Sequence, residues 1–279
     1  LMKKNTLTPK TLNCFIPCHL QQLVLDHYLY VTNELFNTIR LFKGLTHLSV
    51  QSCTVFTDKA LEAIAGLKKL VYLDFSNCTQ LTNKSLKHLK THKNLETLKL
   101  DNTKVTDEGL CSLFEDSEWN KLHTLSLSKT GVANKTVEVI QAKNLKELHL
   151  EQTNVSELEP LVRLTGFAHL NVGGTRITNQ SLLCLRNHPS LKKLNLHQTQ
   201  ITDRGLAHLT GLHLVELRLP DRLTITDVGI SHLQGLPLTS LDLTDYVKIT
   251  DEALRTVGQM TGLTRLSLSK TKISDNGMQ

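Results

Sequence analysis

Two histidines are the first residues whose spacing could support chemistry. His88 and His92 lie four residues apart in LKHLKTHK, so a helix would place both imidazoles on one face. A zinc site needs further ligands beyond two imidazoles, and the surrounding sequence supplies none at a suitable spacing. We therefore predict no metal site and expect both histidines to lie on a solvated helix surface.

The cysteines show no pattern typical of metal binding or disulfide capping. No Cys-x-x-Cys pair occurs, and neither end has a cluster like those of disulfide-capped secreted repeat proteins. The six are Cys14, Cys18, Cys53, Cys78, Cys111 and Cys184. We expect free thiols and an intracellular protein, cytoplasmic or nuclear. The sequence also has no signal peptide and no membrane-length apolar run, so we expect no membrane partner.

Motifs of known catalytic sites are absent. The sequence contains no P-loop, no Rossmann glycine fingerprint, no Gly-x-Ser-x-Gly and no His-Glu-x-x-His. We therefore predict a non-enzymatic protein with no catalytic residues and no cofactor. The net charge of +6 is spread along the chain without a basic run of five residues, so nucleic acid is not the expected partner.

A repeated Leu-x-x-Leu-x-Leu pattern organises the chain. It begins eleven times at intervals of 22 to 27 residues, at Leu20, Leu45, Leu70, Leu95, Leu122, Leu145, Phe167, Leu191, Leu214, Leu238 and Leu263. The alternating leucines predict a short strand with one apolar face. Each unit then continues with a polar step, an aliphatic residue, Thr-Asp or Thr-Asn, and a leucine-rich helical pattern, as in ITDRGL at 201–206.

These units predict a stacked α/β architecture. The threonine or aspartate is expected to cap the helix N-terminus by accepting an amide hydrogen bond. One unit cannot bury its own apolar face, so the units must stack. We expect a horseshoe-shaped solenoid with a parallel β-sheet on the concave side and helices on the convex side. Residues 1–19 are predicted to be an N-terminal cap or degenerate repeat, and residues 20–279 a domain of about eleven repeats.

The units resemble leucine-rich repeats of the cysteine-containing type found in F-box proteins. Cys53 in SVQSCTVFTD and Cys78 in DFSNCTQLTN match the cysteine of that pattern, which implies a structural rather than a reactive role. Most later units carry threonine there and shorten the following step by one residue; these are Thr103, Thr130, Thr153, Thr175, Thr199 and Thr271. We expect each hydroxyl to bond the turn backbone of the neighbouring unit.

Strand alternation identifies a candidate binding face. Non-leucine residues within and just after each motif should face solvent on the concave side. They include a polar, partly basic patch formed by His149, His169, Asn171, Lys193, Asn195, His197 and Arg218. Tyr72, Asp74 and Asp101 belong to a more acidic area nearer the N-terminus. We predict that these residues bind a protein or peptide ligand, the basic patch an acidic one. The alternative is that they only keep the strand face soluble.

Three units depart from the pattern. Segment 111–121 lengthens one unit and contains Trp119, which is expected to pack over the helix end; the alternative is a protruding contact. Pro160 should shorten or open a helix. Pro220 should break the regular ladder and push Asp221 and Arg222 outward.

The resemblance implies a protein-protein interaction module. We expect the substrate-recognition part of a ubiquitin-ligase receptor, with any cullin-ligase adaptor bound through regions outside this sequence, although no F-box or elongin-binding motif is found. The chain begins at Leu1 and stops within a unit, so we expect a fragment with a truncated last repeat. The alternatives are a scaffold or regulator without a ligase and, further, an RNA-binding solenoid.

Overall fold

Each Leu-x-x-Leu-x-Leu motif folds into a three-residue strand, as the alternating leucines predicted. The computed structural model describes residues 7–28, 30–115 and 119–278. The chain divides into two compact units, residues 1–145 and 146–279.

The first unit contains five parallel strands joined in chain order. They are β1 (Gln22–Val24), β2 (His47–Ser49), β3 (Tyr72–Asp74), β4 (Thr97–Lys99) and β5 (Thr124–Ser126). Its helices are α1 (Pro9–Asn13), α2 (Asn33–Ile39), α3 (Lys59–Ile64), α4 (Asn83–Leu86), α5 (Asp107–Phe114) and α6 (Asn134–Val139). Two 3₁₀ segments, η1 (Ile16–Cys18) and η2 (Lys87–Leu89), complete it.

The second unit repeats this arrangement with six parallel strands. They are β6 (Glu147–His149), β7 (His169–Asn171), β8 (Lys193–Asn195), β9 (Glu216–Arg218), β10 (Ser240–Asp242) and β11 (Arg265–Ser267). The helices are α7 (Asn179–Leu182), α8 (Asp203–Leu206), α9 (Asp227–Ser231) and α10 (Asp251–Gly258). The 3₁₀ segments are η3 (Glu159–Arg163), η4 (Leu183–Leu185), η5 (Ala207–Leu209) and η6 (Asp275–Met278).

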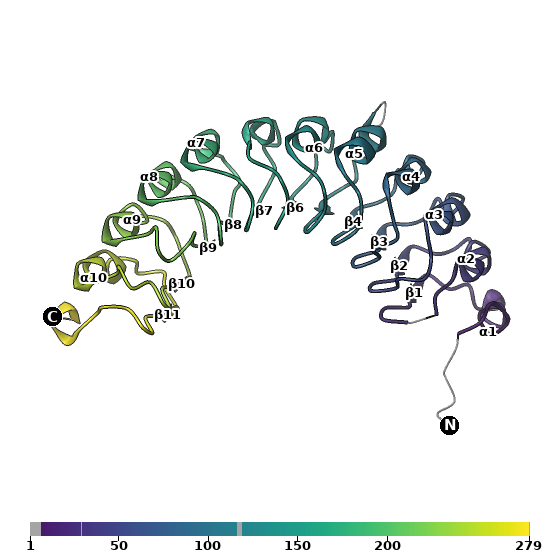
Figure 1. Cartoon of the computed structure of the whole chain (residues 1–279), viewed down its shortest axis with the longest axis horizontal. Helices are drawn as coiled ribbons and strands as arrows, with labels where there is room; N and C mark the ends of the chain where they lie inside the picture. Colours follow the sequence, from purple (N-terminus) through teal and green to yellow (C-terminus); the bar gives the residue numbers. More distant parts are fainter. Residues whose placement is uncertain (1–6, 29, 116–118, 279) are drawn as a thin grey trace, which may run out of the picture. The chain divides into compact units, whose positions relative to one another are not determined.

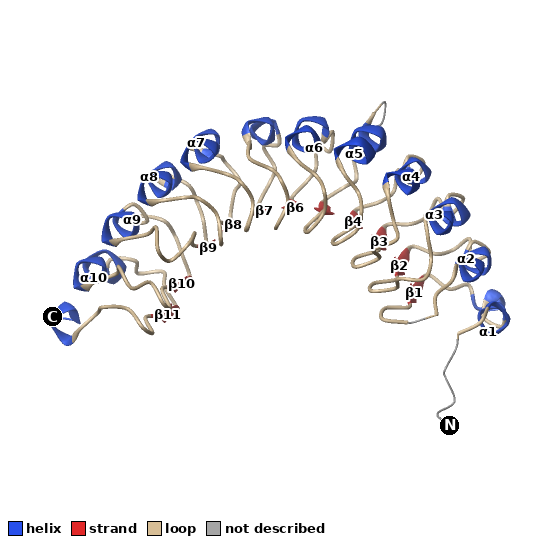
Figure 2. Cartoon of the chain, viewed as in Figure 1, coloured by secondary structure: helices blue, strands red, loops and turns tan. Residues whose placement is uncertain are grey.

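In each unit the strands lie along one side and the helices along the other (Figure 1). Figure 2 shows the same division by element type, with loops crossing between the two sides. Leucines of neighbouring strands pair in register, for example Leu23 with Leu48 and Leu170 with Leu194. These leucines and the leucines of the helices fill the space between the two layers. No helix in the described residues is long and apolar enough to cross a lipid bilayer.

Cysteine and threonine fill the same repeat position but bond different partners. Cys53 and Cys78 are buried, and their thiols lie close to carbonyl oxygens of the preceding repeat; Cys78 Sγ is 3.0 Å from the oxygen of Val50. The threonine hydroxyls instead donate to the carbonyl three residues earlier in their own repeat, as Thr103 does to Leu100 at 2.7 Å. Our expectation that the hydroxyls bond the neighbouring unit is therefore wrong, because the shorter step folds each hydroxyl back onto its own strand.

A ladder of Asp and Asn side chains links successive repeats. Each accepts a hydrogen bond, at 2.7–2.9 Å, from the backbone N–H of the residue just before the equivalent position in the next repeat. The acceptors are Asn33, Asp58, Asn83, Asp107, Asn179, Asp203, Asp227 and Asp251. Helix capping belongs instead to the preceding threonine: Thr82, Thr226 and Thr250 accept amide hydrogen bonds from their own helices. The prediction of a cap is thus confirmed for these threonines and wrong for the aspartates.

This ladder explains a glycine in the Thr-Asp-x-Gly sequence. A Cβ on Gly229 would collide with Oδ1 of Asp203, and a Cβ on Gly109 would lie 2.5 Å from Oδ1 of Asn83. The missing side chain therefore leaves room for the carboxylate or amide that reaches across from the preceding repeat.

Two of the irregular units behave as predicted. Trp119 is only 1% exposed, its indole N–H donates to the carbonyl of Leu113, and its ring contacts Phe114 edge-on. It is a core residue, not a protruding contact; residues 116–118 of the same segment lie outside the described part. Pro160 lies in the first turn of η3, the 3₁₀ segment that this repeat has where most other repeats have an α-helix.

His92 contradicts the expected solvated surface. It lies beyond the short helix of its repeat and is fully buried, with Nε2 3.2 Å from the carbonyl oxygen of Ile64 and Nδ1 without a partner. His188 occupies the same position in a later repeat and is also buried, with Nε2 unpartnered. Burial lowers the pKa of both imidazoles. The described residues hold no group of three or more side chains arranged for a metal ion.

Candidate functional site

A polar groove of about 990 Å³ runs along the strand face of the second unit. Its walls come from β6 to β11 and from the turns after β9 and β10. All seven residues of the predicted patch line it: His149, His169, Asn171, Lys193, Asn195, His197 and Arg218. The structure therefore brings these side chains together, as the alternation of strand residues predicted; that they bind a ligand stays a prediction.

Strand register orders the groove into two columns. His169, Lys193, Glu216, Ser240 and Arg265 follow one another across neighbouring strands in the first column. Asn171, Asn195 and Arg218 do the same in the second. Each column places one side chain per strand, so a ligand lying across the strands meets a new residue at each repeat.

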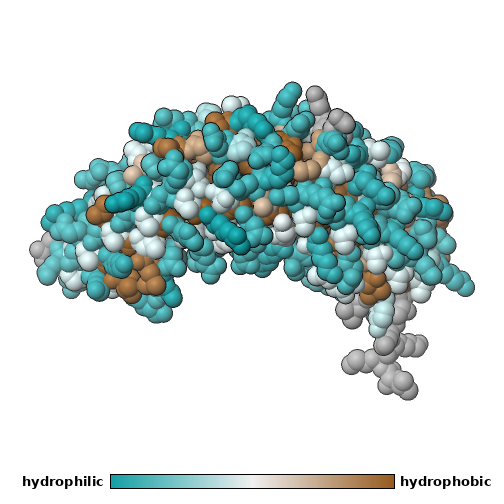
Figure 3. Space-filling view, turned by 45° about the horizontal axis from the view of Figure 1, so that its top comes forward, coloured by the Kyte–Doolittle hydropathy of each residue, from teal (hydrophilic) through white to brown (hydrophobic). Residues whose placement is uncertain are grey.

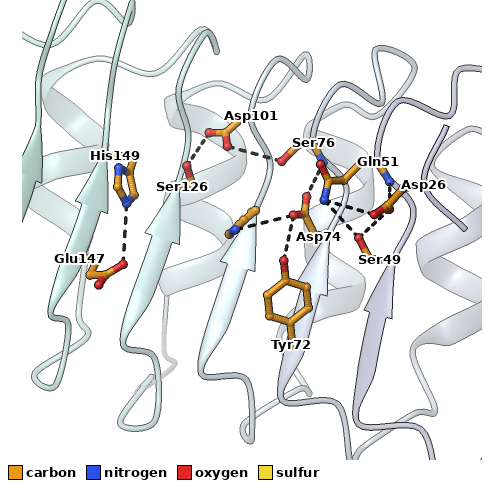
Figure 4. A network of polar contacts seen from close by, with 11 residues as sticks. Asp26, Ser49, Gln51, Tyr72, Asp74, Ser76, Asp101, Ser126, Glu147 and His149 are labelled. Carbon is orange, nitrogen blue, oxygen red and sulfur yellow. Dashed lines mark hydrogen bonds and ion pairs between the residues drawn. The ribbon is translucent and has the colours of Figure 1, made fainter. Parts of the chain in front are cut away.

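Polar contacts between neighbouring strands lie at one end of the first column. Glu147 contacts His169 at 2.9 Å and His149 at 3.9 Å, and Figure 4 shows its contact with His149. Lys193 pairs with Glu216 at 2.7 Å on the neighbouring strand. These side chains are partly exposed, so each pair contributes little to stability. Each pair nevertheless fixes the positions of its two side chains in the groove.

The second column supports the turns that follow the strands. Asn171 accepts a hydrogen bond from the N–H of Gly173 at 3.1 Å, and Asn195 accepts one from His197 at 3.0 Å. Asp242 does the same for Thr244 at 2.9 Å. Each side chain thus satisfies a backbone donor two residues further on.

Arg218 is the exception in this column. The residue two positions later is Pro220, which has no N–H to satisfy, so the position does not need an acceptor. The loss of regular pairing is visible between β9 and β10, where only Glu216 and Ser240 are in register. The predicted break in the ladder at Pro220 is therefore confirmed, and it leaves the Arg218 guanidinium exposed in the groove.

The carboxylates of the groove are occupied, whereas two guanidiniums are not. Glu216 binds Lys193, Asp221 accepts from the N–H of Leu223, and Asp242 accepts from Thr244. Across the described residues, Arg218 and Arg265 make no side-chain hydrogen bond or ion pair. The groove therefore presents two guanidiniums without an ion-pair partner to a ligand, whereas each of these three carboxylates already has one partner.

Nearby titratable groups respond to this charge. Partial burial, followed by the Arg218 guanidinium, lowers the pKa of His197. Hydrogen bonds from Thr244, with a smaller contribution from Arg218, lower the pKa of Asp242. At neutral pH the centre of the groove thus holds a neutral imidazole, an ionised carboxylate and an arginine.

The predicted acidic area lies in the first unit and is a hydrogen-bonded network (Figure 4). Asp101 accepts from the hydroxyl of Ser126 at 2.6 Å and from the N–H of Ser128 at 2.7 Å. Asp74 accepts from the hydroxyl of Tyr72 at 3.1 Å and from the N–H of Ser76 at 2.9 Å.

Asp74 does not face solvent as expected. Its side chain is 2% exposed and also lies 3.9 Å from Nζ of Lys99. The neighbouring side chains and the turn backbone enclose the carboxylate, which therefore holds the strand exit together. Tyr72 remains partly exposed, stacked on His47 and covered by Lys99.

Strand alternation also placed Glu216, Ser240, Asp242 and Arg265 on the strand face, although they were not among the predicted site residues. Arg222, which was expected only to point outward after Pro220, and Tyr246, which was not singled out, lie in turns and were not among the predicted site residues either. Tyr246 stands at the cysteine position of its repeat and donates its hydroxyl hydrogen to the carbonyl of Pro220 at 2.8 Å. That shared repeat position is the one sequence signal that could have indicated its buried role.

Comparison with known proteins agrees with this architecture. A family model described as a leucine-rich repeat matches residues 45–65, 91–114, 187–210 and 259–279. No curated protein matches the chain in sequence.

Three solved structures with a similar fold are bacterial proteins. An internalin (inlF) of Listeria monocytogenes is 20% identical, with a TM-score of 0.53, and the match covers 96% of this chain and 85% of that one. Internalin C2 of the same organism is 22% identical, with a TM-score of 0.57 and coverages of 79% and 84%. A leucine-rich-repeat protein of Leptospira interrogans is 19% identical, with a TM-score of 0.59 and coverages of 96% and 82%. These likenesses show the fold alone; the cysteine-containing subtype is not confirmed by them. The matched repeats and the structure together show that the chain has a leucine-rich-repeat fold.

Proposed function

We propose that the chain is a protein-binding module whose binding site is the polar groove of the second unit. Stacked repeats form extended surfaces of this kind for binding other proteins. The observation that carries the proposal is Arg218, an exposed guanidinium without an ion-pair partner in the described chain, at the centre of a groove whose carboxylates are occupied.

The partner supported by this charge arrangement is an acidic protein segment. A carboxylate at Arg218 would gain charge-assisted hydrogen bonds. The side-chain amide nitrogen of Asn195 also has no hydrogen-bond partner in the described chain and is a second donor for the ligand. Because these contacts are partly exposed, binding should weaken as the salt concentration rises.

Site-directed photocrosslinking tests whether the groove is the binding site. A photoreactive amino acid replaces Ser240, a groove residue that makes no ion pair, and in a matched protein it replaces Arg255 on the exposed side of α10. Protein adducts should form from position 240 and not from position 255. Adducts that form only from position 255 would place the binding site on the helices and refute the groove.

Charge reversal tests whether the basic side chains of the groove bind the partner. Lys193→Glu with Arg218→Glu should abolish capture of the crosslinked partner. The matched control is Lys192→Glu with Arg176→Glu, which makes the same change of charge at exposed residues outside the groove. Equal capture by both double variants would show that net charge, not the groove, governs binding.

For the finer role we propose the substrate-recognition part of an intracellular ubiquitin-ligase receptor. The resemblance of the units around Cys53 and Cys78 to F-box-type repeats supports this. Affinity purification of the full-length protein from cells should recover Skp1, elongin or a cullin. Recovery of none of them would favour a scaffold or regulator without a ligase.

A further inference from the structure

The turns after β9 and β10 are tied to each other beside the groove. The hydroxyl of Tyr246 donates to the carbonyl of Pro220 at 2.8 Å, and Arg222 pairs with Asp245 at 3.1 Å. Nζ of Lys248 donates to the carbonyl of Leu223 at 2.6 Å. Residues 220–224 and 244–248 are therefore braced against each other by these three contacts.

These turns expose two aliphatic side chains. Leu223 is 60% exposed and Val247 is 43% exposed. They occupy the same position in adjacent repeats, directly after the cysteine position. At this position the other repeats with the longer step carry Leu29, Thr54 and Thr79. The aliphatic residues are thus not a requirement of the longer turn.

The two residues belong to turns that border the groove. Pro220, Asp221, Arg222 and Tyr246, which belong to the same turns, line it together with Arg218. On the face shown in Figure 3 the surface is mostly hydrophilic, with small separate apolar patches. Single exposed aliphatic residues are ordinary on a protein surface; two neighbours on braced turns that border a groove with an unpaired guanidinium are a more specific feature.

We propose that Leu223 and Val247 form an apolar ledge that receives an aliphatic side chain of the same acidic segment whose carboxylate binds Arg218. The inference rests on the proposed function and adds a second point of recognition to it. Because the turns are already braced, covering the ledge buries apolar surface without further ordering of the backbone. A segment with only carboxylates would leave the ledge in water, and one with only aliphatic residues would leave Arg218 unpaired.

A displayed library of random peptides provides the probe. The purified chain selects binders, and fluorescence anisotropy measures the affinity of each selected peptide for defined variants. Leu223→Ser with Val247→Ser removes the ledge. Val55→Ser with Leu183→Ser is the matched control, because these residues are also exposed, at 49% and 40%, and lie outside the two turns at 220–224 and 244–248. Arg218→Gln tests the carboxylate contact, with Arg176→Gln as its control.

The proposal predicts selected peptides that combine a carboxylate with an aliphatic side chain. Their affinity should fall at least about tenfold in the ledge variant and in Arg218→Gln, and by less than about twofold in both controls. Peptides that need Arg218 but bind the ledge variant unchanged would overturn the ledge while leaving the groove as the binding site. Peptides that bind independently of Arg218 would overturn both proposals. Circular dichroism of each variant checks that its fold is intact.

Discussion

Asp203 offers the sharpest test of how the repeats hold together. Its carboxylate accepts hydrogen bonds from the N–H of Thr226 at 2.9 Å and from the hydroxyl of the same residue at 2.7 Å. Asp203→Ala removes both bonds and leaves the Thr226 amide without its partner. Asp203→Asn is the matched variant, because Asn179 makes the equivalent pair of bonds to Thr202 one repeat earlier, both at 2.9 Å.

The expected losses in the free energy of unfolding follow from the number of hydrogen bonds removed and from their exposure to water. A hydrogen bond to a charged group contributes about 1.5–3 kcal/mol to the free energy of unfolding. Asp203 is half-buried, so water replaces part of what alanine removes. We expect a loss of about 2–3 kcal/mol for Asp203→Ala. For Asp203→Asn we expect less than about 1 kcal/mol, because an amide oxygen accepts from the N–H and the amide nitrogen donates to the hydroxyl.

Urea denaturation followed by circular dichroism measures the loss in the free energy of unfolding of the whole chain. Hydrogen exchange of the Thr226 amide measures the loss of protection at the bond itself. The alanine variant should exchange this proton faster than the wild type, whereas the asparagine variant should not. If asparagine destabilises as much as alanine, the bond geometry does not explain the ladder. If alanine leaves stability unchanged, the ladder does not contribute to holding the repeats.

Three further predictions concern the fold. Gly229→Ala should lower the free energy of unfolding by about 1–3 kcal/mol, because the new Cβ must displace the Asp203 carboxylate, and urea denaturation checks it. Thermal stability should fall as the pH drops below the ordinary histidine pKa of 6.5. Burial lowers the pKa of His92 and His188 in the folded chain. Below pH 6.5 the unfolded chain therefore takes up protons that the folded chain does not, and the unfolded state is favoured. His188→Leu should flatten this dependence in differential scanning fluorimetry, and an unchanged profile would exclude His188 as its source. Trp119→Ala should cost about 3–5 kcal/mol in urea denaturation, because it empties a fully enclosed site; a loss below 1 kcal/mol would contradict the packing.

Repeat periodicity was sufficient to predict the elements. The alternating leucines located the strands, and the Thr-Asp and Thr-Asn pairs located the helix starts, because both patterns depend on local backbone geometry. The buried role of Cys53 followed from its place in the repeat in the same way.

The candidate site was predictable only in part. Alternation placed Lys193, Asn195 and Arg218 on one face, since successive strand side chains point to opposite sides of a sheet. It did not show that Lys193 is paired with Glu216 or that Arg218 is unpaired. Those pairings depend on side-chain conformations in neighbouring repeats.

Sequence alone therefore determined the repeat, its strands and helices, and which residues share a face. The tertiary structure decided which charges are neutralised and that Asp74 is buried. It also decided that Asp203 bonds the next repeat and not its own helix, and that Leu223 lies exposed in a turn that borders the groove. The physical reason is that each of these properties involves atoms from residues some 23 to 26 positions apart. Such contacts exist only after stacking brings equivalent positions of successive repeats together.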